Sequence, residues 1–401
     1  MATDNRAGAG LSSRRIRIVH LQLLPLMSGV QRVSLDELTR LDRNRFEPFV
    51  ICKETGPFTE ALVRAGIPFF LVPELVREIS PRQDWLALHK LTRLFREQRF
   101  DIVHTHSSKT GILGRLAGRL AGVPVVMHTV HGYAFPAARN AFQFWLYLLL
   151  EWLGARITDA LILLKREDAE LAAKRLQVAA DRLHLVPNGV DVLHYVPRGE
   201  AERNLIRQGH LGVTADCVAI GMVGRLWHQK NPDCFVRAAI RLLRSGHDQA
   251  RFFLIGDGEL RPSLEARLQE VGCADRIRIL GWQDDVAGLL AGLDIFVLPS
   301  RWEGLSLAIL EAMSSGLPVV VSDIPGNRDL VNVGVDGYVF RPDDDADLAA
   351  KLASLIADAD LRRRFGTNGR RKVTDRFTLA DRIDKIERIY LQLLERKAAL
   401  G

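Results

Sequence analysis

The stretch DIFVLPSRWEGLSLAILEAMSSGLPVVVSD, residues 294–323, contains a strand, a helix and a second strand in direct succession. Its opening apolar run ends at about Pro299 and is typical of a strand buried on both faces of a parallel sheet. LSLAILEAMSS has a helical pattern that ends at Gly316, just before Leu317 and Pro318. PVVVSD then has the composition of the next buried strand. This order predicts an α/β fold with parallel strands.

Similar apolar runs alternate with helical patterns on both sides of this stretch. One series extends from RIRIVHL (15–21) to LHLVP (183–187), and a second extends from VAIGMVG (218–224) to GYVF (337–340). PNGVDVLHYVP (187–197) separates the two series with proline and glycine. The sequence therefore predicts an α/β protein with two Rossmann-like domains, each a doubly wound parallel sheet. The expected boundaries are 1–13 for a disordered tail, 14–190 and 191–379 for the two domains, and 380–401 for a final helix.

The charge of the 401-residue chain is unevenly distributed. The net charge is +7, and residues 1–190 hold 26 Lys and Arg against 18 Asp and Glu, whereas the remainder holds 29 against 30. A basic first half indicates an acidic partner such as a phosphate or an anionic lipid. Nucleic acid is not expected as a partner, because no zinc-finger spacing or RNA-binding signature is present. Four cysteines without pair spacing favour a reducing compartment over a disulfide framework.

Two glutamates in the opening stretch are unusual for a helix that packs in a core. Glu303 and Gly304 follow the carboxyl end of a predicted strand, where ligands bind in open α/β sheets. The N-terminus of the following helix favours anions, so Glu303 suits a ligand that offers hydroxyl groups as well as phosphates. Glu311 lies about 2.2 turns further along the same helix. A sugar nucleotide fits this pattern, and the alternative is that Glu303 merely caps the helix.

Two further loops follow predicted strands in the same half of the chain. GMVGRLWHQKN (221–231) places Arg225 and Lys230 after a strand, where two cations can hold a diphosphate. LIGDGELRPSLE (254–265) offers glycines for close approach of the backbone. A solvated pair of charges remains the alternative for Arg225 and Lys230.

These motifs together resemble glycosyltransferase family 4, whose members are retaining enzymes of the GT-B fold. The resemblance rests on Gly224-Arg225-Leu226, Lys230-Asn231, Gly256-Asp257-Gly258-Glu259 and the E-x7-E pair Glu303 and Glu311. In the first half, DIVHTHSSKTGILGRLAGRLAGVPVVMHTVHGYAF (101–135) is similar to bacterial enzymes that build capsule, exopolysaccharide or O-antigen repeats. The resemblance implies two domains that face a central cleft, with the final helix crossing back to the first domain. It also implies a nucleotide-sugar donor, expected to be UDP-linked, and no cofactor or metal.

The resemblance also assigns expected roles to individual residues. The residues expected near the reacting centre are Glu303, Arg225, Lys230 and His131. Those expected to contact the donor are Gly29, Gly224, Asp257, Gly258, Trp282, Gly304, Leu305, Ser306 and Glu311. Those expected to contact the acceptor are His106, Ser107, Ser108 and Lys109, with helix capping as the alternative for the two serines. One departure is LPLMSGVQR, where Ser28 replaces the first glycine of a pair found in many relatives.

Histidines are concentrated in the first half of the chain. His104 and His106 lie on one predicted strand, and His128 and His131 lie on the next. A metal site is conceivable for such a group. We do not expect one, because the sequence shows no cysteine or clear carboxylate partner beside these histidines.

The expected activity is retaining, metal-independent transfer of a sugar to a polyprenyl-diphosphate-linked glycan in bacterial surface polysaccharide synthesis. The alternatives are a sugar-nucleotide 2-epimerase of the same fold and a non-catalytic sugar-nucleotide-binding module. A dehydrogenase is disfavoured because no G-x-G-x-x-G follows the first strand.

A peripheral, cytoplasmic association with an anionic membrane is also expected. Residues 77–139 hold ten Lys and Arg against four Asp and Glu, and five aromatics follow between Phe142 and Trp152. The apolar run 141–155 is too short to span a bilayer and predicts a buried helix rather than a membrane-inserting one. No secretory signal is visible at the start of the sequence.

Overall fold

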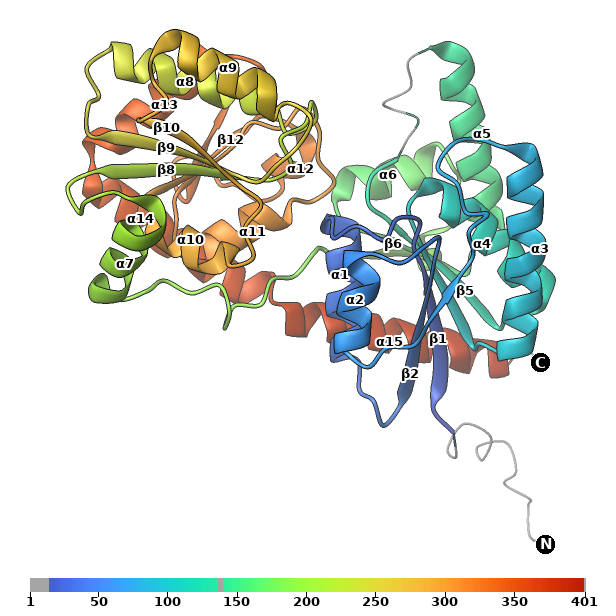
Figure 1. Cartoon of the computed structure of the whole chain (residues 1–401). Helices are drawn as coiled ribbons and strands as arrows, with labels where there is room; N and C mark the ends of the chain where they lie inside the picture. Colours follow the sequence, from blue (N-terminus) through green and yellow to red (C-terminus); the bar gives the residue numbers. More distant parts are fainter. Residues whose placement is uncertain (1–13, 134, 136–139, 400–401) are drawn as a thin grey trace, which may run out of the picture. The chain divides into compact units, whose positions relative to one another are not determined.

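The computed structural model describes residues 14–133, 135 and 140–399. The predicted disordered tail, residues 1–13, lies outside the described residues. The chain divides into two compact units: unit 1 is Met1–Val186 with Ile383–Gly401, and unit 2 is Pro187–Arg382 (Figure 1). The predicted divisions at 190 and 380 lie a few residues from these boundaries.

Unit 1 is built on a parallel sheet. Within the described residues the sheet has seven strands in the order β3-β2-β1-β4-β5-β6-β7, so the strand order reverses between β1 and β4. Ligands bind at the carboxyl ends of strands beside such a reversal. The strands are β1 Ile16–Leu21, β2 Phe46–Cys52, β3 Phe69–Leu71, β4 Ile102–His106, β5 Val125–Val130, β6 Ala160–Leu163 and β7 Leu183–Leu185.

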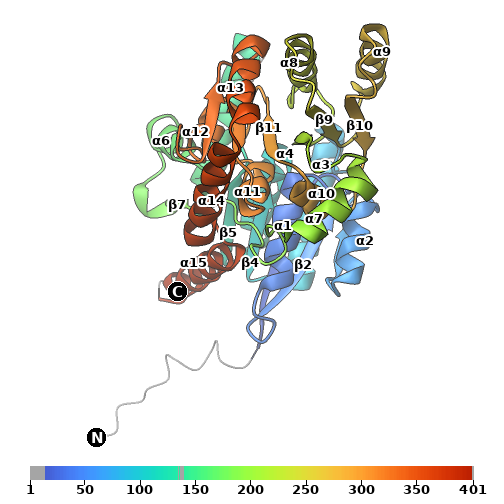
Figure 2. The same cartoon turned by 90° about the vertical axis from the view of Figure 1, so that its left-hand side faces the viewer.

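Helices cover the sheet of unit 1, including one from the far end of the sequence. The helix α15 (Leu379–Ala398) lies against this sheet in Figures 1 and 2. Its Tyr390 is fully buried and hydrogen-bonds to histidines of β1 and β4. The other helices of this unit are α1 Gly29–Arg40, α2 Pro57–Arg64, α3 Pro81–Gln98, α4 Ser108–Ala121, α5 Ala141–Arg156 and α6 Arg166–Lys174.

Unit 2 repeats the doubly wound pattern. Among the described residues its sheet has six parallel strands in the order β10-β9-β8-β11-β12-β13, and the order reverses between β8 and β11. The strands are β8 Val218–Val223, β9 Ala250–Ile255, β10 Ile277–Gly281, β11 Ile295–Leu298, β12 Val319–Ser322 and β13 Gly337–Phe340. The helices are α7 Glu200–Ile206, α8 Pro232–Arg244, α9 Arg261–Val271, α10 Val286–Gly292, α11 Leu307–Ser314, α12 Pro325–Arg328, α13 Asp345–Ala357 and α14 Ala359–Arg376.

The strand–helix–strand unit predicted for residues 294–323 is confirmed as β11, α11 and β12. Phe296, Val297 and Leu298 of β11 pair in parallel with β12 and are fully buried. The helix α11 ends at Ser314, and Gly316 adopts a positive φ of 79° that a residue with a side chain rarely takes. The helix therefore ends where the sequence pattern indicates.

The helix predicted over residues 141–155 is confirmed as α5, but the prediction that it is buried is wrong. The corresponding helix α5 buries only Glu151, Gly154 and Ala155, and it exposes several large apolar side chains. Its apolar residues occur on all sides, so the sequence pattern could not indicate which side would be covered. No described helix is long and apolar enough to cross a bilayer.

Candidate active site

Two loops of unit 2 meet at the point where its strand order reverses. One follows β8 and the other follows β11, and these strands are neighbours in the sheet. The backbone N–H of Arg301 donates to the carbonyl of Gln229 at 2.8 Å, and the side chain of Gln229 donates to the carbonyl of Trp302 at 2.9 Å. These hydrogen bonds hold the two loops together at the ligand-binding edge of the sheet.

Lys230 and Glu303, both predicted site residues, are in direct contact. Lys230 Nζ donates to Glu303 Oε1 at 2.6 Å, and Ser300 Oγ donates to the same oxygen at 2.6 Å. The Glu303 side chain is only 8% exposed, so this ion pair is far less screened than a surface pair. The simple capping role for Glu303 is not what the structure shows, since Ser306 occupies the N-cap position of α11.

Glycine residues allow the loops after β8 and β9 to approach each other closely. A Cβ placed on Gly256 would lie 2.1 Å from the carbonyl oxygen of Gly224, and one on Gly258 would lie 2.4 Å from that of Leu226. Gly224 and Gly256 also have φ of 152° and 140°. Only glycine fits such a contact. The glycines at 256 and 258 therefore let the loop after β9 pack directly on the backbone of the loop after β8.

Arg225 is exposed at the same edge. Its Cζ lies 4.5 Å from the centroid of the Trp227 ring, and this cation–π contact orients the guanidinium while leaving the group exposed. The two predicted cations thus have different surroundings. Lys230 is held in an ion pair, whereas Arg225 rests on an aromatic face.

The N-terminus of α11 carries three predicted donor contacts. Gly304 packs so closely against Gly326 that a Cβ on the latter would lie 2.2 Å from the Gly304 carbonyl oxygen. Leu305 is buried, and its carbonyl accepts from Asn188 Nδ2 at 2.7 Å. Ser306 Oγ is buried and has no hydrogen-bond partner among the described residues. A buried hydroxyl of this kind is costly unless a ligand completes it.

Glu311, Asp257 and Trp282 complete the predicted set in unit 2. Glu311 lies in the second turn of α11 and is half-buried. Asp257 is exposed and forms a 2.7 Å ion pair with Arg261, which holds the pKa of its carboxyl below the ordinary value. Trp282 is exposed and follows Gly281, whose carbonyl accepts from Gly256 N at 2.8 Å. The Asp257 carboxylate therefore stabilises its own loop by pairing with Arg261.

In unit 1 the structure joins His131 to His106. His131 follows β5 and is half-buried, and His106 ends β4 and is fully buried. His131 Nε2 and His106 Nδ1 are 3.0 Å apart and share a hydrogen bond. Burial and the neighbouring histidines hold the pKa of His106 well below its ordinary value, so its ring is neutral at pH 7.

The other predicted acceptor residues lie at the start of α4. Ser107 occupies the N-cap position with a φ of 68°, and its side chain makes no capping hydrogen bond. Simple capping by Ser107 is therefore not observed, and a positive φ at a residue with a side chain is uncommon outside functional loops. Ser108 is half-buried as the first residue of α4. Lys109 Nζ forms a 2.7 Å ion pair with Asp84, which draws this lysine toward α3.

Gly29 begins α1 at the carboxyl end of β1. It is exposed, and a Cβ added to it would meet nothing within 4 Å. The hydroxyl of the preceding Ser28 donates to the side chain of Gln31. The exposed helix N-terminus expected at this loop is therefore present. A larger residue would also fit at position 29, because no atom lies close enough to exclude a side chain.

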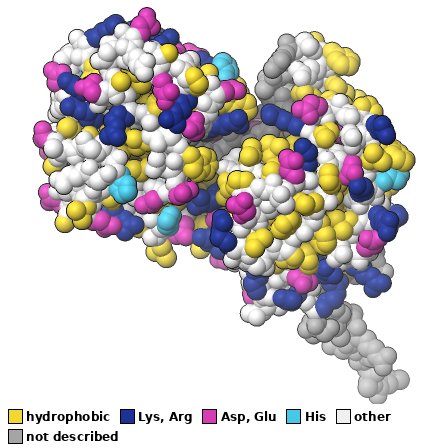
Figure 3. Space-filling view, in the orientation of Figure 1, with side chains coloured by type: hydrophobic (Ala, Val, Ile, Leu, Met, Phe, Trp, Pro, Cys, Tyr) yellow, Lys and Arg dark blue, Asp and Glu magenta, His cyan; other side chains and the backbone are white. Residues whose placement is uncertain are grey.

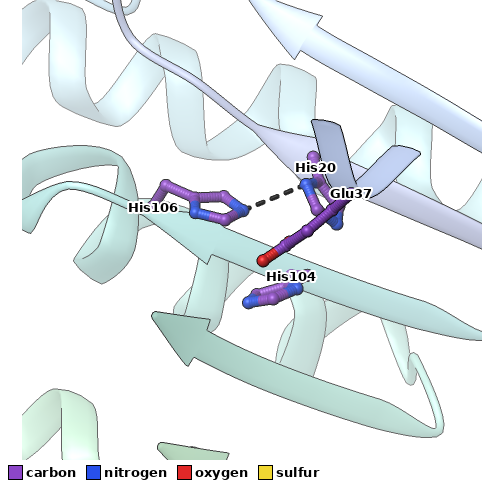
Figure 4. A group of neighbouring side chains, drawn as sticks. All are labelled: His20, Glu37, His104 and His106. Atoms are coloured by element: carbon purple, nitrogen blue, oxygen red, sulfur yellow. Dashed lines mark hydrogen bonds between the residues drawn. The ribbon is translucent and has the colours of Figure 1, made fainter. Parts of the chain in front are cut away.

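The histidines of unit 1 form a group that the sequence did not reveal in full. His20 of β1 and Glu37 of α1 lie beside His104 and His106, and one ligand atom from each of the four lies within 4.8 Å of the others (Figure 4). No carboxylate beside these histidines could be identified from the sequence, and the fully buried Glu37 is such a carboxylate. A polar residue within the apolar strand IRIVHL was the available signal for His20.

Comparison with known proteins agrees with this geometry. Residues 27–193 match the model of Glycosyltransferase Family 4, and residues 218–358 match that of Glycosyl transferases group 1. A relative in Escherichia coli, UDP-Gal:alpha-D-GlcNAc-diphosphoundecaprenol alpha-1,3-galactosyltransferase, is 41% identical over 96% of this chain and 98% of its own. The putative glycosyltransferase EpsD of Bacillus subtilis is 28% identical over 77% of this chain and 81% of its own.

A solved structure has the same fold. HepE of Anabaena, crystallised with UDP, superimposes with a TM-score of 0.80 at 22% identity and covers 94% of this chain and 100% of its own. That likeness extends over both parallel-sheet units. The chain therefore has the GT-B fold and belongs to glycosyltransferase family 4.

Proposed function

We propose that this glycosyltransferase transfers a sugar from a UDP-sugar to a polyprenyl-diphosphate-linked glycan, with retention of configuration and without a metal ion. The 41% identical relative, whose name contains both a UDP-sugar and a diphosphoundecaprenol acceptor, supports the substrate classes. The observation that carries the site assignment is the contact between Lys230 and Glu303 beside the N-terminus of α11.

The donor diphosphate is held by cations and by a helix N-terminus in this proposal. Lys230 has three N–H groups, of which one is used on Glu303, so the others can point to a phosphate. Arg225 adds a second cation, and the backbone of Gly304–Ser306 with the buried Ser306 hydroxyl adds donors. As the glycosidic bond breaks, negative charge grows on the leaving phosphate, and these groups stabilise it. They perform the task that a divalent cation performs in other transferases.

The two glutamates bind hydroxyl groups at opposite ends of the donor. Glu303 binds hydroxyls of the transferred sugar, with Lys230 and Ser300 fixing its carboxylate. Glu311, in the second turn of α11, binds the ribose. The backbone of the turn at Trp282 contacts the nucleotide base of the donor. Because Glu303 Oε1 already accepts two hydrogen bonds, we favour a binding role for this carboxylate over nucleophilic attack. Retention then follows from reaction on one face, with the leaving phosphate taking the acceptor's proton.

The acceptor brings the enzyme to a membrane in this proposal, and α5 supplies the contact. Phe142, Trp145, Leu149 and Leu153 recur at helical spacing and are 78%, 62%, 52% and 48% exposed. Leu116 and Leu120 on the neighbouring α4 are also exposed. Figure 3 shows hydrophobic side chains exposed on unit 1 with Lys and Arg among them. An apolar face beside cations is suited to an anionic lipid surface.

A transfer assay tests the proposal directly. Purified enzyme is incubated with UDP-galactose, UDP-glucose or UDP-N-acetylglucosamine, with and without a synthetic polyprenyl-diphosphate-linked N-acetylglucosamine, and UDP release is measured. We expect release that depends on the lipid-linked acceptor and a product whose new linkage has the α configuration of the donor by NMR. Release that is equally fast without any acceptor, or a β-linked product, would contradict the proposal.

A further inference from the structure

A series of hydrogen bonds connects Glu303 to a part of unit 2 that the proposed function does not use. This part, residues 322–327, contains the last residue of β12 and the start of α12 and is called the β12–α12 segment below. Its Ser322 and Asn327 are fully buried, as is Ser300 in the loop after β11. Buried polar groups are usually paired within the protein, because an unsatisfied one is costly.

The series begins at Asn327 and ends at the carboxylate of Glu303. Asn327 Nδ2 donates to the carbonyl of Ser322 at 3.0 Å and to its hydroxyl at 3.2 Å. The Ser322 hydroxyl donates to the carbonyl of Ser300. The Ser300 hydroxyl donates to Glu303 Oε1 at 2.6 Å. Fully buried side chains thus link α12 to the carboxylate that pairs with Lys230.

The direction of each hydrogen bond in this series is fixed by groups that can only accept. A backbone carbonyl has no proton to donate, so Asn327 must face Ser322 with its amide nitrogen, and the Ser322 hydroxyl must donate to Ser300. The carboxylate of Glu303, which forms an ion pair with Lys230, likewise accepts from the Ser300 hydroxyl. The series therefore has a single arrangement of protons.

A glycine of α12 approaches the backbone of the same turn. A Cβ placed on Gly326 would lie 2.2 Å from the carbonyl oxygen of Gly304 and 3.0 Å from that of Glu303. The φ of Gly326 is not positive, so the left-handed region does not explain a glycine at this position. The close approach does. Thus α12 contacts the Glu303 turn at its backbone through Gly326 and is linked to the carboxylate through Asn327.

We propose that the β12–α12 segment sets the position of the Glu303 carboxylate and thereby determines how strongly the enzyme discriminates between donors by the hydroxyl groups of the transferred sugar. This inference rests on the proposed function, in which Glu303 binds those hydroxyls. Ser300, Ser322 and Asn327 are positioning residues, since they act on the sugar only through Glu303. A carboxylate held at one place accepts well only from a hydroxyl that points to that place, so its position selects among sugars.

The competing explanation is that these buried groups only stabilise unit 2. Both explanations predict that removing a hydroxyl lowers thermal stability, because a buried partner then loses its hydrogen bond. They differ in the effect on the folded enzyme. Loss of the correct Glu303 position lowers kcat but leaves UDP binding intact, since UDP lacks the transferred sugar. A purely stabilising role leaves the kcat of the folded enzyme unchanged.

Two serine variants test the positioning role. Ser300→Ala removes the donor to Glu303, and Ser322→Ala removes the hydroxyl behind it. In Ser300→Ala the kcat for transfer should fall roughly tenfold, the equivalent of one lost hydrogen bond to a charged group. In Ser322→Ala it should fall several-fold, and calorimetry should give the wild-type Kd for UDP in both variants. If an alanine variant does not fold, the cysteine variant at that position replaces it, because a thiol fills the space but donates weakly.

Ser314→Ala is the matched control for these variants. Ser314 is also a fully buried serine of unit 2, and its hydroxyl donates to the carbonyl of Tyr195 at 2.7 Å, outside the series. Its removal should lower the thermal midpoint as Ser322→Ala does, but kcat should stay at the wild-type value. Wild-type kcat in both test variants, or an equal loss of kcat in the control, would overturn the proposal.

Donors that lack one hydroxyl give a readout specific to the position of Glu303. The UDP-sugar that the transfer assay identifies is compared with its deoxy analogues, each of which lacks one hydroxyl of the sugar. The wild type should transfer one analogue much more slowly, because the hydroxyl that Glu303 binds is missing. This preference for the parent sugar should shrink in Glu303→Gln and in Ser322→Ala alike. An undiminished preference in Ser322→Ala would overturn the proposal.

A double-mutant cycle without substrate separates this inference from the proposed function. The free energies of unfolding are measured for Ser322→Ala, Glu303→Gln and the double variant. Because both residues are hydrogen-bonded to Ser300, their effects should not add, whereas those of Ser314→Ala and Glu303→Gln should add. If no UDP-sugar is transferred, the proposed function fails, and the cycle still decides whether the segment acts on Glu303. Additive effects of Ser322→Ala and Glu303→Gln would show that it does not.

Discussion

Lys230 Nζ lies 2.6 Å from Glu303 Oε1, although the two residues are 73 positions apart in the sequence. The contact couples the cation proposed for the leaving phosphate to the carboxylate proposed for the sugar. Removing the lysine therefore has two effects: it deletes a charge beside the phosphate, and it leaves a nearly buried carboxylate without its ion-pair partner.

Lys230→Ala should lower kcat by roughly 100-fold or more, the range for a lost donor to a developing charge. Arg225→Ala should lower kcat similarly. Because Arg225 is exposed, its loss should leave the thermal midpoint unchanged, whereas Lys230→Ala should also lower the midpoint. Steady-state kinetics and thermal melts measure both. Lys90→Ala, which breaks an exposed ion pair with Glu74, is the control. Turnover within a few-fold of wild type for both site variants would disprove the diphosphate assignment.

The two glutamates should differ in what their loss impairs. Glu303→Gln should mainly lower kcat, because the contact to the transferred sugar strengthens as the bond breaks. Glu311→Gln should mainly weaken binding of UDP, because the ribose contact is present in the ground state. Calorimetric titration with UDP separates them, since UDP lacks the sugar. Wild-type affinity for UDP in the Glu311 variant would show that the ribose role is wrong.

The sequence predicted the elements of this site better than their contacts. The apolar run before Pro299 and the helix stop at Gly316 are local signals, and β11 and α11 formed where these signals indicated. Ser300 was missed, because a serine after a strand has no pattern of its own, and its bond to Glu303 depends on the folded turn.

Burial and long-range clusters were the features that the sequence could not supply. A run that is apolar on all sides predicts a helix but not which face is covered, and α5 proved to be only partly buried. Of its five aromatics, Phe144, Tyr147 and Trp152 pack against the core, whereas Phe142 and Trp145 do not. Glu37 and Tyr390 join the histidines only because α1 and α15 pack on the same sheet.

Gly256→Ala should destabilise the protein and weaken UDP binding together. The added Cβ would lie 2.1 Å from the carbonyl oxygen of Gly224, and φ is 140°. The strained backbone alone costs about 1–3 kcal/mol, and the clash adds to this by pushing the two loops apart. Gly246→Ala is the matched control, because φ is 84° there but nothing lies within 4 Å of the added carbon. Equal losses of thermal stability in the two variants would show that the close approach of the loops contributes nothing to the free energy of unfolding.

Activity should persist in excess chelator. In our proposal Arg225, Lys230 and the N-terminus of α11 supply the positive charge at the leaving phosphate, so no divalent cation is needed there. Initial rates with and without EDTA should agree within a factor of about two, which corresponds to about 0.4 kcal/mol in the free energy of activation. Loss of activity that magnesium or manganese restores would contradict the proposal.

The exposed face of α5 should bind anionic membranes reversibly. Liposome flotation with anionic vesicles should bring the protein to the top at low salt, and the bound fraction should fall as salt screens the cations. Replacing Phe142 and Trp145 by serine removes on the order of 3 kcal/mol of apolar transfer, roughly a 100-fold loss of partitioning. Leu193→Ser is the matched control, because Leu193 is an even more exposed apolar side chain in unit 2. Equal flotation of the double variant and the wild type would mean that another surface meets the lipid. No flotation of the wild type at low salt would mean that the enzyme takes its acceptor from solution.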